Sequence, residues 1–261
     1  MVRTINLAAA ASLVNGLEDA ITAFKNSDSE YDDVDFICKY DGSYTLANAI
    51  ANGTDLTSDL FLAAAQDAML NSRIPGIEVK IVIATKDDFI GNSLVLIKNK
   101  KGVANLTNIT SFETLTLANL GSGHAWIANP DNAPAGKYAK DAIELTTSTG
   151  NWGALLVKAS NEGTLGSNVQ TTLAGLLANT NPAVGLVYNS DYKNSPSIPD
   201  TNAFFVAYAP QSVNDNIIYP AAVLTNAASH GVDTIAAAFV TFLKNYADTY
   251  FTVAMGYTSL N

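Results

Sequence analysis

The sequence contains a single cysteine and two histidines, and this shortage excludes several kinds of chemistry. Cys38 has no second cysteine to pair with, so the chain can form neither an intramolecular disulfide nor a zinc site built from several cysteines. His124 lies at the start of an apolar run and His230 in an expected loop, and two histidines make a poor metal site. We therefore expect no metal held directly by side chains, and we interpret both histidines as structural or surface residues.

Charge is also scarce, and most of it is negative. Charged residues make up 15% of the chain, and 14 basic against 24 acidic residues give a formal net charge of −10. Proteins that bind nucleic acid usually carry a basic face, so this balance argues against a nucleic-acid partner. It does not exclude a small anion as ligand, because a few local donors can outweigh a distant negative field.

Long apolar runs are missing as well. No run approaches the roughly 20 residues that are needed to cross a bilayer. A secretory signal would need a basic start, a longer apolar core and a cleavage site, and none of these follows Met1. Two expectations stay open at this point: a cytoplasmic protein, or the mature form of an exported protein with an added Met1.

The sequence does contain a regular alternation of strand-like and helix-like segments. Apolar or alternating runs predict strands at 4–10, 33–39, 59–63, 93–97, 124–128, 183–188, 203–208 and 217–224. Amphipathic spacing predicts helices at 13–24, around 46–50, from 134 onward, at 169–177 and at 235–246. Pro220 favours an edge or a crossing segment for the last strand. Such alternation with short loops predicts an α/β fold of parallel sheets covered by helices, and 261 residues allow one large or two medium domains.

Four of the predicted helices begin in a similar way, directly after a strand or a loop. Ser12 and Ser43 are the predicted N-caps of the first two, Ala135 and Gly136 open the third, and Val169 opens the fourth. A helix start carries unpaired N–H groups and a partial positive charge. Ligands of open α/β sheets bind beyond the carboxyl ends of the strands. We therefore interpret Ala135 and Gly136 as small so that the backbone N–H can reach an oxyanion.

Two other interpretations compete with an anion site. Ordinary capping needs no ligand, because a serine N-cap stabilises a helix by about 1 kcal/mol and proline is common in the first turn. An enzyme is the second, because Ser190-Asp191-Tyr192-Lys193 forms an S-x-x-K string like that of serine acyl-enzymes. The string has no S-D-N or K-T-G partner and follows a predicted strand, so we expect no enzymatic activity.

Segments spread over almost the whole chain carry a resemblance to a known family. They are AAAASL (8–13), GSYTLANAIANGTDLTSDLFLAA (42–64), GNSLVLI (91–97), NPDNAPAGKYAKDAI (129–143), SNVQTTLAGLLANTNPAVGLVYNSD (167–191) and YPAAV (219–223). With these segments the chain resembles the periplasmic molybdate-binding proteins of ABC transporters, which belong to the substrate-binding protein superfamily. The P-A-G-x-Y-A pattern of the fourth segment is the most specific of them.

The resemblance implies a set of neutral donors for an oxyanion. The matching positions are the hydroxyl and N–H groups of Ser12 and Ser43, the N–H groups of Ala135 and Val169, and the hydroxyl of Tyr188. It also implies a periplasmic-binding-protein type II fold, with two lobes that are each a mostly parallel sheet flanked by helices and that are joined by two crossing strands. We expect lobe I to comprise residues 1–90 plus 221–261 and lobe II residues 91–220, with the ligand in the cleft between them.

Several positions depart from the family pattern. Gly42 and Tyr44 replace serines that flank the binding serine, and Asn129 replaces an aspartate. Where the family has S-A-D after its third strand, the chain reads Ala-Ala-Ala-Gln at 63–66, which puts Ala65 in place of the acid. These changes bear on the shape and the size selectivity of the pocket.

The donor set predicts the kind of anion. A site made of N–H and O–H donors prefers a fully deprotonated tetrahedral dianion, because only an acceptor such as a carboxylate could take the proton of hydrogen phosphate. No acidic residue occupies a matched position, and the nearby Asp41 and Asp131 are interpreted as turn residues. Molybdate, tungstate or sulfate is therefore favoured over phosphate.

The resulting hypothesis is a solute-binding protein that delivers molybdate or tungstate to the membrane permease of an ABC transporter. We expect it to act without a cofactor, as a monomer, in the periplasm, or outside the cell with a lipid anchor. Two alternatives stay open: a binding protein for another anion such as sulfate, and an effector-binding domain that has no role in transport.

Overall fold

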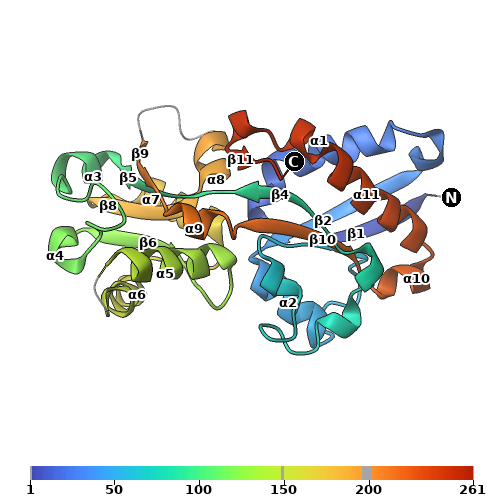
Figure 1. Ribbon diagram of the computed structural model, residues 1–261, viewed down its shortest axis with the longest axis horizontal. Coiled ribbons are helices and arrows are strands. Elements are labelled where there is room, and N and C mark those ends of the chain that lie inside the picture. The colour runs from blue at the N-terminus through green and yellow to red at the C-terminus, as the bar shows by residue number, and fades with distance from the viewer. Residues whose placement is uncertain (1, 148–149, 196–201, 261) are drawn as a thin grey trace. The chain divides into compact units, whose positions relative to one another are not determined.

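The computed structural model describes residues 2–147, 150–195 and 202–260, and the chain divides into two compact units. Unit 1 comprises Met1–Gly91, Ile218–Val253 and Tyr257–Asn261, and unit 2 comprises Asn92–Ile217 and Ala254–Gly256. Each unit contains its own sheet with helices packed beside it (Figure 1). The predicted α/β class is thereby confirmed.

Unit 1 is built on a mixed sheet with the strand order β11-β4-β10-β3-β1-β2. Its strands are β1 (Arg3–Ala10), β2 (Val34–Asp41), β3 (Leu60–Leu62), β4 (Asp87–Asn92), β10 (Ile218–Val223) and β11 (Tyr257–Thr258). β1 pairs in parallel with β2 and β3, whereas β10 runs antiparallel to β3 and β4. The sheet is mixed because a strand from the C-terminal part of the chain enters it between β3 and β4.

β10 shows how an interior strand accommodates a proline. It pairs with β3 on one side and β4 on the other, so of the two predicted positions the edge is wrong and the crossing segment stays open. The pairing with β4 shifts register between Tyr219 and Pro220, where the proline has no N–H to donate. The chain passes from unit 2 into unit 1 directly before this strand, between Ile217 and Ile218.

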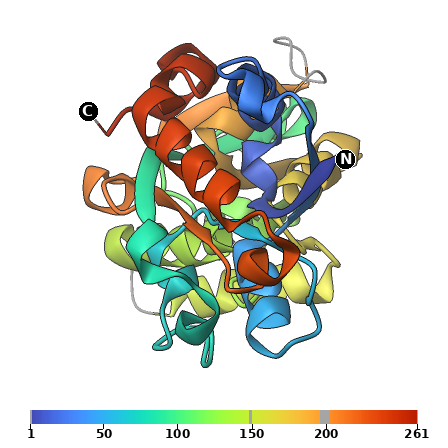
Figure 2. The same ribbon diagram turned by 90° about the vertical axis from the view of Figure 1, so that its right-hand side faces the viewer.

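Helices cover the sheet of unit 1. They are α1 (Val14–Lys25), α2 (Ser43–Ala51), α10 (Asn226–His230) and α11 (Asp233–Tyr250), and short 3-10 turns include η1 (Ala11–Leu13) and η2 (Ser29–Tyr31). Figure 2 shows α11 running across the face of unit 1 that is turned to the viewer. Its Phe239 packs against Phe24 of α1 with ring centroids 5.1 Å apart, and both rings are buried. The helix predicted at 235–246 is therefore confirmed and extends further in both directions.

Unit 2 is built on a second mixed sheet, ordered β7-β6-β8-β5-β9. Its strands are β5 (Leu94–Asn99), β6 (His124–Ala128), β7 (Leu165–Gly166), β8 (Ala183–Tyr188) and β9 (Ala203–Tyr208). Its helices are α3 (Lys100–Asn105), α4 (Leu117–Leu120), α5 (Pro134–Thr146), α6 (Asn151–Asn161), α7 (Val169–Ala178), α8 (Asn189–Asn194) and α9 (Gln211–Asn214). β6 pairs in parallel with β7 and β8, and β5 runs antiparallel to β8 and β9, so all antiparallel pairing in this sheet involves β5.

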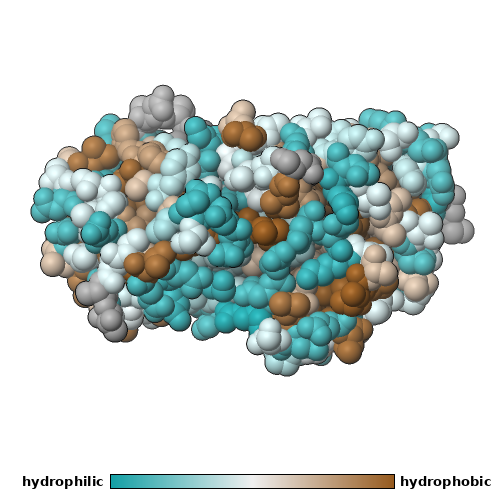
Figure 3. Space-filling model, viewed as in Figure 1, coloured by the Kyte–Doolittle hydropathy of each residue, from teal (hydrophilic) through white to brown (hydrophobic). Residues whose placement is uncertain are grey.

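The segment between β3 and β4 exposes hydrophobic side chains. It forms the 3-10 turns η3 (Gln66–Met69), η4 (Glu78–Lys80) and η5 (Ile83–Thr85). Val79 is 73% exposed and Ile83 is 61% exposed, and Figure 3 shows hydrophobic surface gathered over this segment. Among the described residues no helix combines the length and the apolar character that a membrane span requires.

Candidate functional site

Two of the predicted ligands lie at the carboxyl ends of neighbouring strands in unit 1. β1 and β2 are parallel and in register, so that Ala10 pairs with Asp41. Ser12 and Ser43 each follow these paired strand ends by two residues, and each is 1% exposed. The structure thus brings both serines to one edge of the sheet.

Ser43 does not cap its helix, contrary to the sequence prediction. The N-cap of α2 is Gly42, and no side chain caps this helix. Ser43 Oγ instead accepts the N–H of Ala64 at 2.9 Å. Ala64 follows β3, which pairs with β1 on the side opposite to β2. The Ser43 hydroxyl oxygen therefore binds the backbone of the segment after β3 and not the N–H groups of its own helix. A hydroxyl that accepts one hydrogen bond keeps its own proton for another acceptor.

Ser12 is not an N-cap either. It lies inside η1, and the N-cap of α1 is Leu13. Ser12 Oγ lies 2.9 Å from Tyr219 Oη, and Tyr257 Oη donates to the Ser12 carbonyl oxygen at 2.6 Å. Sequence reasoning found Tyr219 only as part of the 219–223 motif and missed Tyr257. A contact across 245 residues leaves no local signal in the sequence.

Aromatic rings surround these partners of Ser12. Phe89 meets Tyr219 edge to face at 6.5 Å, and Phe251 meets Tyr257 in the same way at 5.2 Å. Gly16 in α1 gives Phe251 its room, because a Cβ at Gly16 would lie 2.7 Å from the Phe251 ring. Ser12 is therefore held in an apolar setting, where hydrogen bonds are electrostatically stronger than in water.

Ala135 and Gly136 lie in the first turn of α5 in unit 2. The N–H of Gly136 donates to Ala133 O at 3.1 Å, and a Cβ at Gly136 would lie 2.1 Å from Ala128 O at the end of β6. The interpretation that Gly136 is small in order to reach an anion is therefore wrong: the helix start packs against the backbone there. Ala135 is 1% exposed, and its first-turn N–H has no intrahelical partner, so it stays a predicted donor.

Val169 is the first residue of α7, directly after a capping box. Asn168 Oδ1 accepts the N–H of Thr171 at 3.0 Å, and Thr171 Oγ1 accepts the N–H of Asn168 at 3.1 Å. This reciprocal cap provides a hydrogen-bond acceptor for the N–H of Thr171, the third residue of the helix, and for the N–H of Asn168, the N-cap. The N–H of Val169 belongs to the same first turn and lies outside the cap.

The predicted donors of unit 2 share one edge of its sheet. α5 follows β6, α7 follows β7, and Tyr188 is the last residue of β8. Because β6 is parallel to both β7 and β8, the carboxyl ends of all three strands lie at the same edge. Tyr188 is 1% exposed. The structure thus brings Ala135, Val169 and Tyr188 to one edge of unit 2, and their role as ligands stays a prediction.

The first two residues of the S-x-x-K string lie in the core of unit 2, whereas Lys193 is exposed. Ser190 is fully buried, and its Oγ accepts a hydrogen bond from Asn92 Nδ2 at 2.8 Å. Asp191 is also fully buried, and burial raises its pKa to about 8 although a hydrogen bond from Gln170 acts in the opposite direction. Ser190 Oγ is thus engaged by a side-chain amide of its own unit, and the fold gives this serine a structural role.

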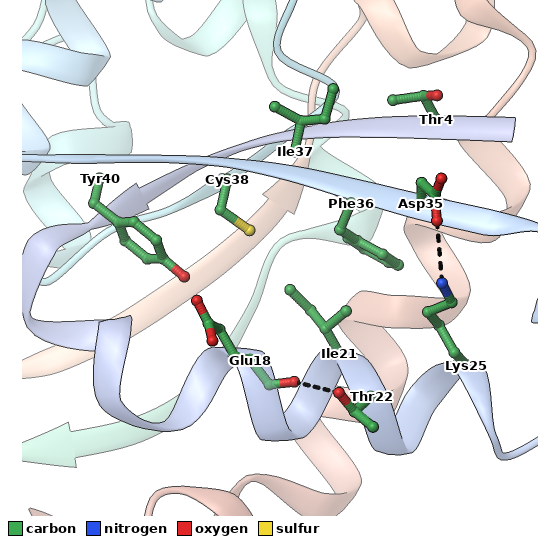
Figure 4. A pocket seen from close by; sticks show the side chains of 10 residues that line it. All are labelled: Thr4, Glu18, Ile21, Thr22, Lys25, Asp35, Phe36, Ile37, Cys38 and Tyr40. Atoms are coloured by element: carbon green, nitrogen blue, oxygen red, sulfur yellow. Dashed lines mark hydrogen bonds and ion pairs between the residues drawn. The ribbon is translucent and has the colours of Figure 1, made fainter.

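A groove of about 600 Å³ lies between α1 and β2 of unit 1 (Figure 4). It is lined by Thr4, Glu18, Ile21, Thr22, Lys25, Asp35, Phe36, Ile37, Cys38 and Tyr40. Burial raises the pKa of the Cys38 thiol and that of the Tyr40 hydroxyl, so both stay protonated at neutral pH. The lining includes neither Ser12 nor Ser43, and the groove is distinct from the predicted donor set of unit 1.

Both histidines have polar neighbours. His230 Nδ1 lies 2.6 Å from Asp59 Oδ1, and His124 Nδ1 lies 3.1 Å from Asn179 Nδ2. Within the described parts of the chain, no group of three or more His, Cys, Asp or Glu side chains is placed to hold a metal ion. His230 is an exposed residue beside a buried aspartate, and His124 is half-buried at the start of β6.

Comparison with known proteins gives matches along nearly the whole chain. The sequence model of the family described as bacterial extracellular solute-binding protein matches residues 5–257. The molybdate-binding protein ModA of Escherichia coli (strain K12) is 32% identical over 241 residues, which are 92% of this chain and 83% of ModA.

Solved structures agree with this match. The substrate binding domain of a putative molybdenum ABC transporter from Clostridium difficile superposes with a TM-score of 0.59 at 25% identity, over 99% of both chains. The sulfate-binding protein SubI from Mycobacterium tuberculosis H37Rv superposes with a TM-score of 0.71 over 99% of this chain and 88% of SubI, and at 17% identity it shows the fold alone.

The extent of the family match decides between a binding protein and an enzyme. It confirms the resemblance to substrate-binding proteins of ABC transporters, and because this family consists of binding proteins, it also confirms that the chain is not an enzyme. The chain belongs to the bacterial extracellular solute-binding protein family.

Proposed function

We propose that this protein binds molybdate or tungstate in the periplasm and delivers the anion to the membrane permease of an ABC transporter, acting as a monomer. The ligand is supported by a relative named molybdate-binding protein at 32% identity and by a structural neighbour from a putative molybdenum transporter. The observation that carries the proposal is the position of Ser12 and Ser43, two buried hydroxyls at the carboxyl ends of strands that pair in register.

The donors of both units bind the same anion in this proposal. Unit 1 contributes the hydroxyl and N–H groups of Ser12 and Ser43, and unit 2 contributes the N–H groups of Ala135 and Val169 and the hydroxyl of Tyr188. The proposed lobes are residues 1–90 plus 221–261 and residues 91–220, with the anion in the cleft between them. These bounds differ from those of the two units only at residues 91, 218–220 and 254–256. Hydrogen bonds to a charged group contribute about 1.5–3 kcal/mol each, so a handful of neutral donors suffices for tight binding.

The first test is calorimetric titration of ligand-stripped protein with molybdate, tungstate, sulfate and phosphate. We expect tight one-to-one binding of molybdate and tungstate, weaker binding of sulfate and none of phosphate. Tightest binding of sulfate would support the alternative of a sulfate-binding protein. No binding of any of the four anions to folded protein would refute the proposal.

The second test is the variant Ser43→Ala, which removes one donor. We expect it to weaken molybdate binding about tenfold or more, because a hydrogen bond to a charged group is lost. Ser58→Ala is the matched control: Ser58 is a buried serine of the same unit, and its Oγ donates to Asp55 Oδ2 at 2.8 Å. Both variants should lose some stability in thermal unfolding, but only Ser43→Ala should lose affinity. Equal affinities of the two variants would exclude the Ser43 hydroxyl as a ligand.

A further inference from the structure

In both predicted serine ligands of unit 1, the hydroxyl oxygen lies within hydrogen-bond distance of another group of the protein. The backbone nitrogen of Ala64 lies 2.9 Å from Ser43 Oγ, and its N–H group can only donate a hydrogen bond. Tyr219 Oη lies 2.9 Å from Ser12 Oγ, and either oxygen of this second pair could be the donor. The direction of the second hydrogen bond decides what Ser12 offers to a ligand.

We propose that Tyr219 is a positioning residue that donates its phenolic proton to Ser12 Oγ, so that the Ser12 hydroxyl proton is directed at the bound anion. This inference rests on the proposed function. A phenol is a stronger donor than an alkyl hydroxyl, which favours this direction. With the opposite direction, Ser12 would turn oxygen lone pairs toward a negatively charged ligand. The anion itself therefore stabilises the arrangement in which Tyr219 donates.

The surroundings of Tyr219 fix its hydroxyl in place. Tyr219 is fully buried on β10, an interior strand, and its ring packs edge to face on Phe89. The backbone of Tyr219 pairs with that of Ile90 in β4, directly before the register shift. A buried hydroxyl must keep a hydrogen-bond partner, and Ser12 Oγ is one within reach.

The consequence is a site in unit 1 that only donates. Ser43 Oγ accepts a hydrogen bond from the Ala64 N–H, and in this proposal Ser12 Oγ accepts one from the Tyr219 hydroxyl. The protons of both serine hydroxyls are then available to the ligand. Tetrahedral anions without a proton, such as molybdate, tungstate and sulfate, satisfy both hydroxyls. Phosphate at neutral pH carries at least one proton and finds no acceptor there. Tyr219 thereby contributes to the selection of fully deprotonated dianions.

A double-mutant cycle tests whether Tyr219 acts through the Ser12 hydroxyl. The variants are Ser12→Ala, Tyr219→Phe and the double variant, titrated with molybdate. Tyr219→Phe keeps the ring on Phe89 and should weaken binding about fivefold in the wild-type background, as the loss of one neutral hydrogen bond predicts. In the Ser12→Ala background the same change should have no further effect, because the hydroxyl through which it acts is gone.

Tyr257→Phe is the matched control, because Tyr257 Oη donates to the carbonyl oxygen of Ser12 and not to its hydroxyl. That carbonyl persists in Ser12→Ala, so any loss caused by Tyr257→Phe should be the same in both backgrounds. Additive losses for Tyr219→Phe and Ser12→Ala would overturn the proposal, since Tyr219 would then support the fold in general. Thermal unfolding of each variant shows that it is folded.

Competition with phosphate gives an independent readout of selectivity. Tyr219→Phe removes the partner that orients the Ser12 hydroxyl, so Ser12 Oγ can rotate and accept a hydrogen bond from the P–OH group of hydrogen phosphate. The ratio of phosphate affinity to molybdate affinity should therefore be higher for Tyr219→Phe than for wild type or for Tyr257→Phe. Failure of phosphate to compete any better would overturn the selective role. The two proposals fail separately: wild type that binds no anion refutes the function, whereas anion binding with an additive cycle refutes only the role of Tyr219.

Discussion

The two units hold their predicted donors in place by different means. In unit 1 the donors include side-chain hydroxyls, and hydrogen bonds with distant residues orient them: Ser43 with the Ala64 N–H and Ser12 with the Tyr219 hydroxyl. In unit 2 two of the donors are backbone N–H groups at helix starts, and close packing at a glycine fixes the start of α5. A Cβ at Gly136 would lie 2.1 Å from a backbone oxygen.

The difference follows from the chemistry of the two kinds of donor. A hydroxyl rotates about its Cβ–Oγ bond, so a partner behind the oxygen is needed to point its proton at a ligand. A backbone N–H has no such freedom once its helix is placed, so only the helix must be positioned. Substitution of side chains should therefore impair unit 1 directly, whereas unit 2 should respond to changes that move or remove backbone.

The largest effect is expected from Gly136→Ala in unit 2. The added Cβ meets Ala128 O and the backbone of Pro130, neither of which can shift cheaply, so the first turn of α5 must move and carry the Ala135 N–H with it. We expect a loss of about 1–3 kcal/mol in the free energy of unfolding and a loss of up to about a hundredfold in molybdate affinity. Urea denaturation and calorimetry measure the two quantities.

Gly153→Ala is the control within the same unit. Gly153 lies in α6, and a Cβ there meets nothing within 4 Å. Alanine in a helix interior is favoured over glycine by about 1 kcal/mol, so this variant should be more stable and bind normally. If Gly136→Ala behaved like Gly153→Ala, close packing at the start of α5 would not be what holds the donor.

A smaller but cleaner effect is expected from Val169→Pro, which removes one backbone N–H. Proline suits the first position of a helix, and the extended conformation of Asn168, with φ −148° and ψ −179°, is compatible with a following proline. The fold should therefore be kept. Because one hydrogen bond to a charged ligand is lost, molybdate affinity should fall about ten- to a hundredfold in calorimetry.

Val169→Ala separates the N–H from the side chain. It keeps the N–H and removes most of a side chain that is 3% exposed, so it should lower the unfolding temperature without lowering the affinity. The reverse pattern, with Val169→Ala binding weakly and Val169→Pro binding well, would show that unit 2 uses side chains as unit 1 does.

Much of this fold could be predicted because its signals are local. Apolar runs gave β6 and β8 at the observed bounds, and amphipathic spacing gave α1, α7 and α11 with small errors at their ends. The pairing of strands is not local. The antiparallel entry of β10 between β3 and β4 brings residues near 220 to residues near 62 and 90, which no window of sequence contains.

In the candidate site too, local features could be predicted and contacts between distant residues could not. The helix starts were recognised from serine, proline and glycine near them, but the sequence assigned Ser12 and Ser43 to capping. Capping rules apply when the hydroxyl has no better partner, and here Tyr219 lies 207 residues away from Ser12 in sequence and yet within hydrogen-bond distance. Gly136 was misread for a related reason, since the atom that excludes a side chain belongs to the preceding strand and not to the helix.

A buried aspartate in each unit extends the comparison to charge. Burial acts to raise the pKa of Asp55 in unit 1, but hydrogen bonds from Ser58 and Thr57, together with Lys39, outweigh it and lower the pKa. Asp191 in unit 2 has its pKa raised to about 8 by burial, and Gln170 offsets this only in part. Asp55 in unit 1 is thus held ionised, whereas Asp191 in unit 2 is held neutral at pH 7.

The last prediction concerns stability alone and not ligand binding: its pH dependence should have opposite signs in the two units. The pKa of Asp191 is raised on folding, so its contribution to stability is complete below about pH 4 and is lost as the pH rises toward about 8. Asp191→Asn keeps an acceptor for Gln170 and cannot ionise. It should therefore gain stability relative to wild type as the pH rises from about 5 to about 8.

Asp55→Asn should show the reverse, because the pKa of Asp55 is lowered on folding. It should be less stable than wild type at neutral pH, and the difference should shrink as the pH falls below about 4. Urea denaturation of the three proteins across this range gives both curves. A difference between Asp191→Asn and wild type that stays flat with pH would mean that Asp191 is ionised in the folded protein. Asp191 in unit 2 would then be a buried charge stabilised by hydrogen bonds, as Asp55 is in unit 1. The two units would differ only in using side-chain hydroxyls or backbone N–H groups as their predicted donors.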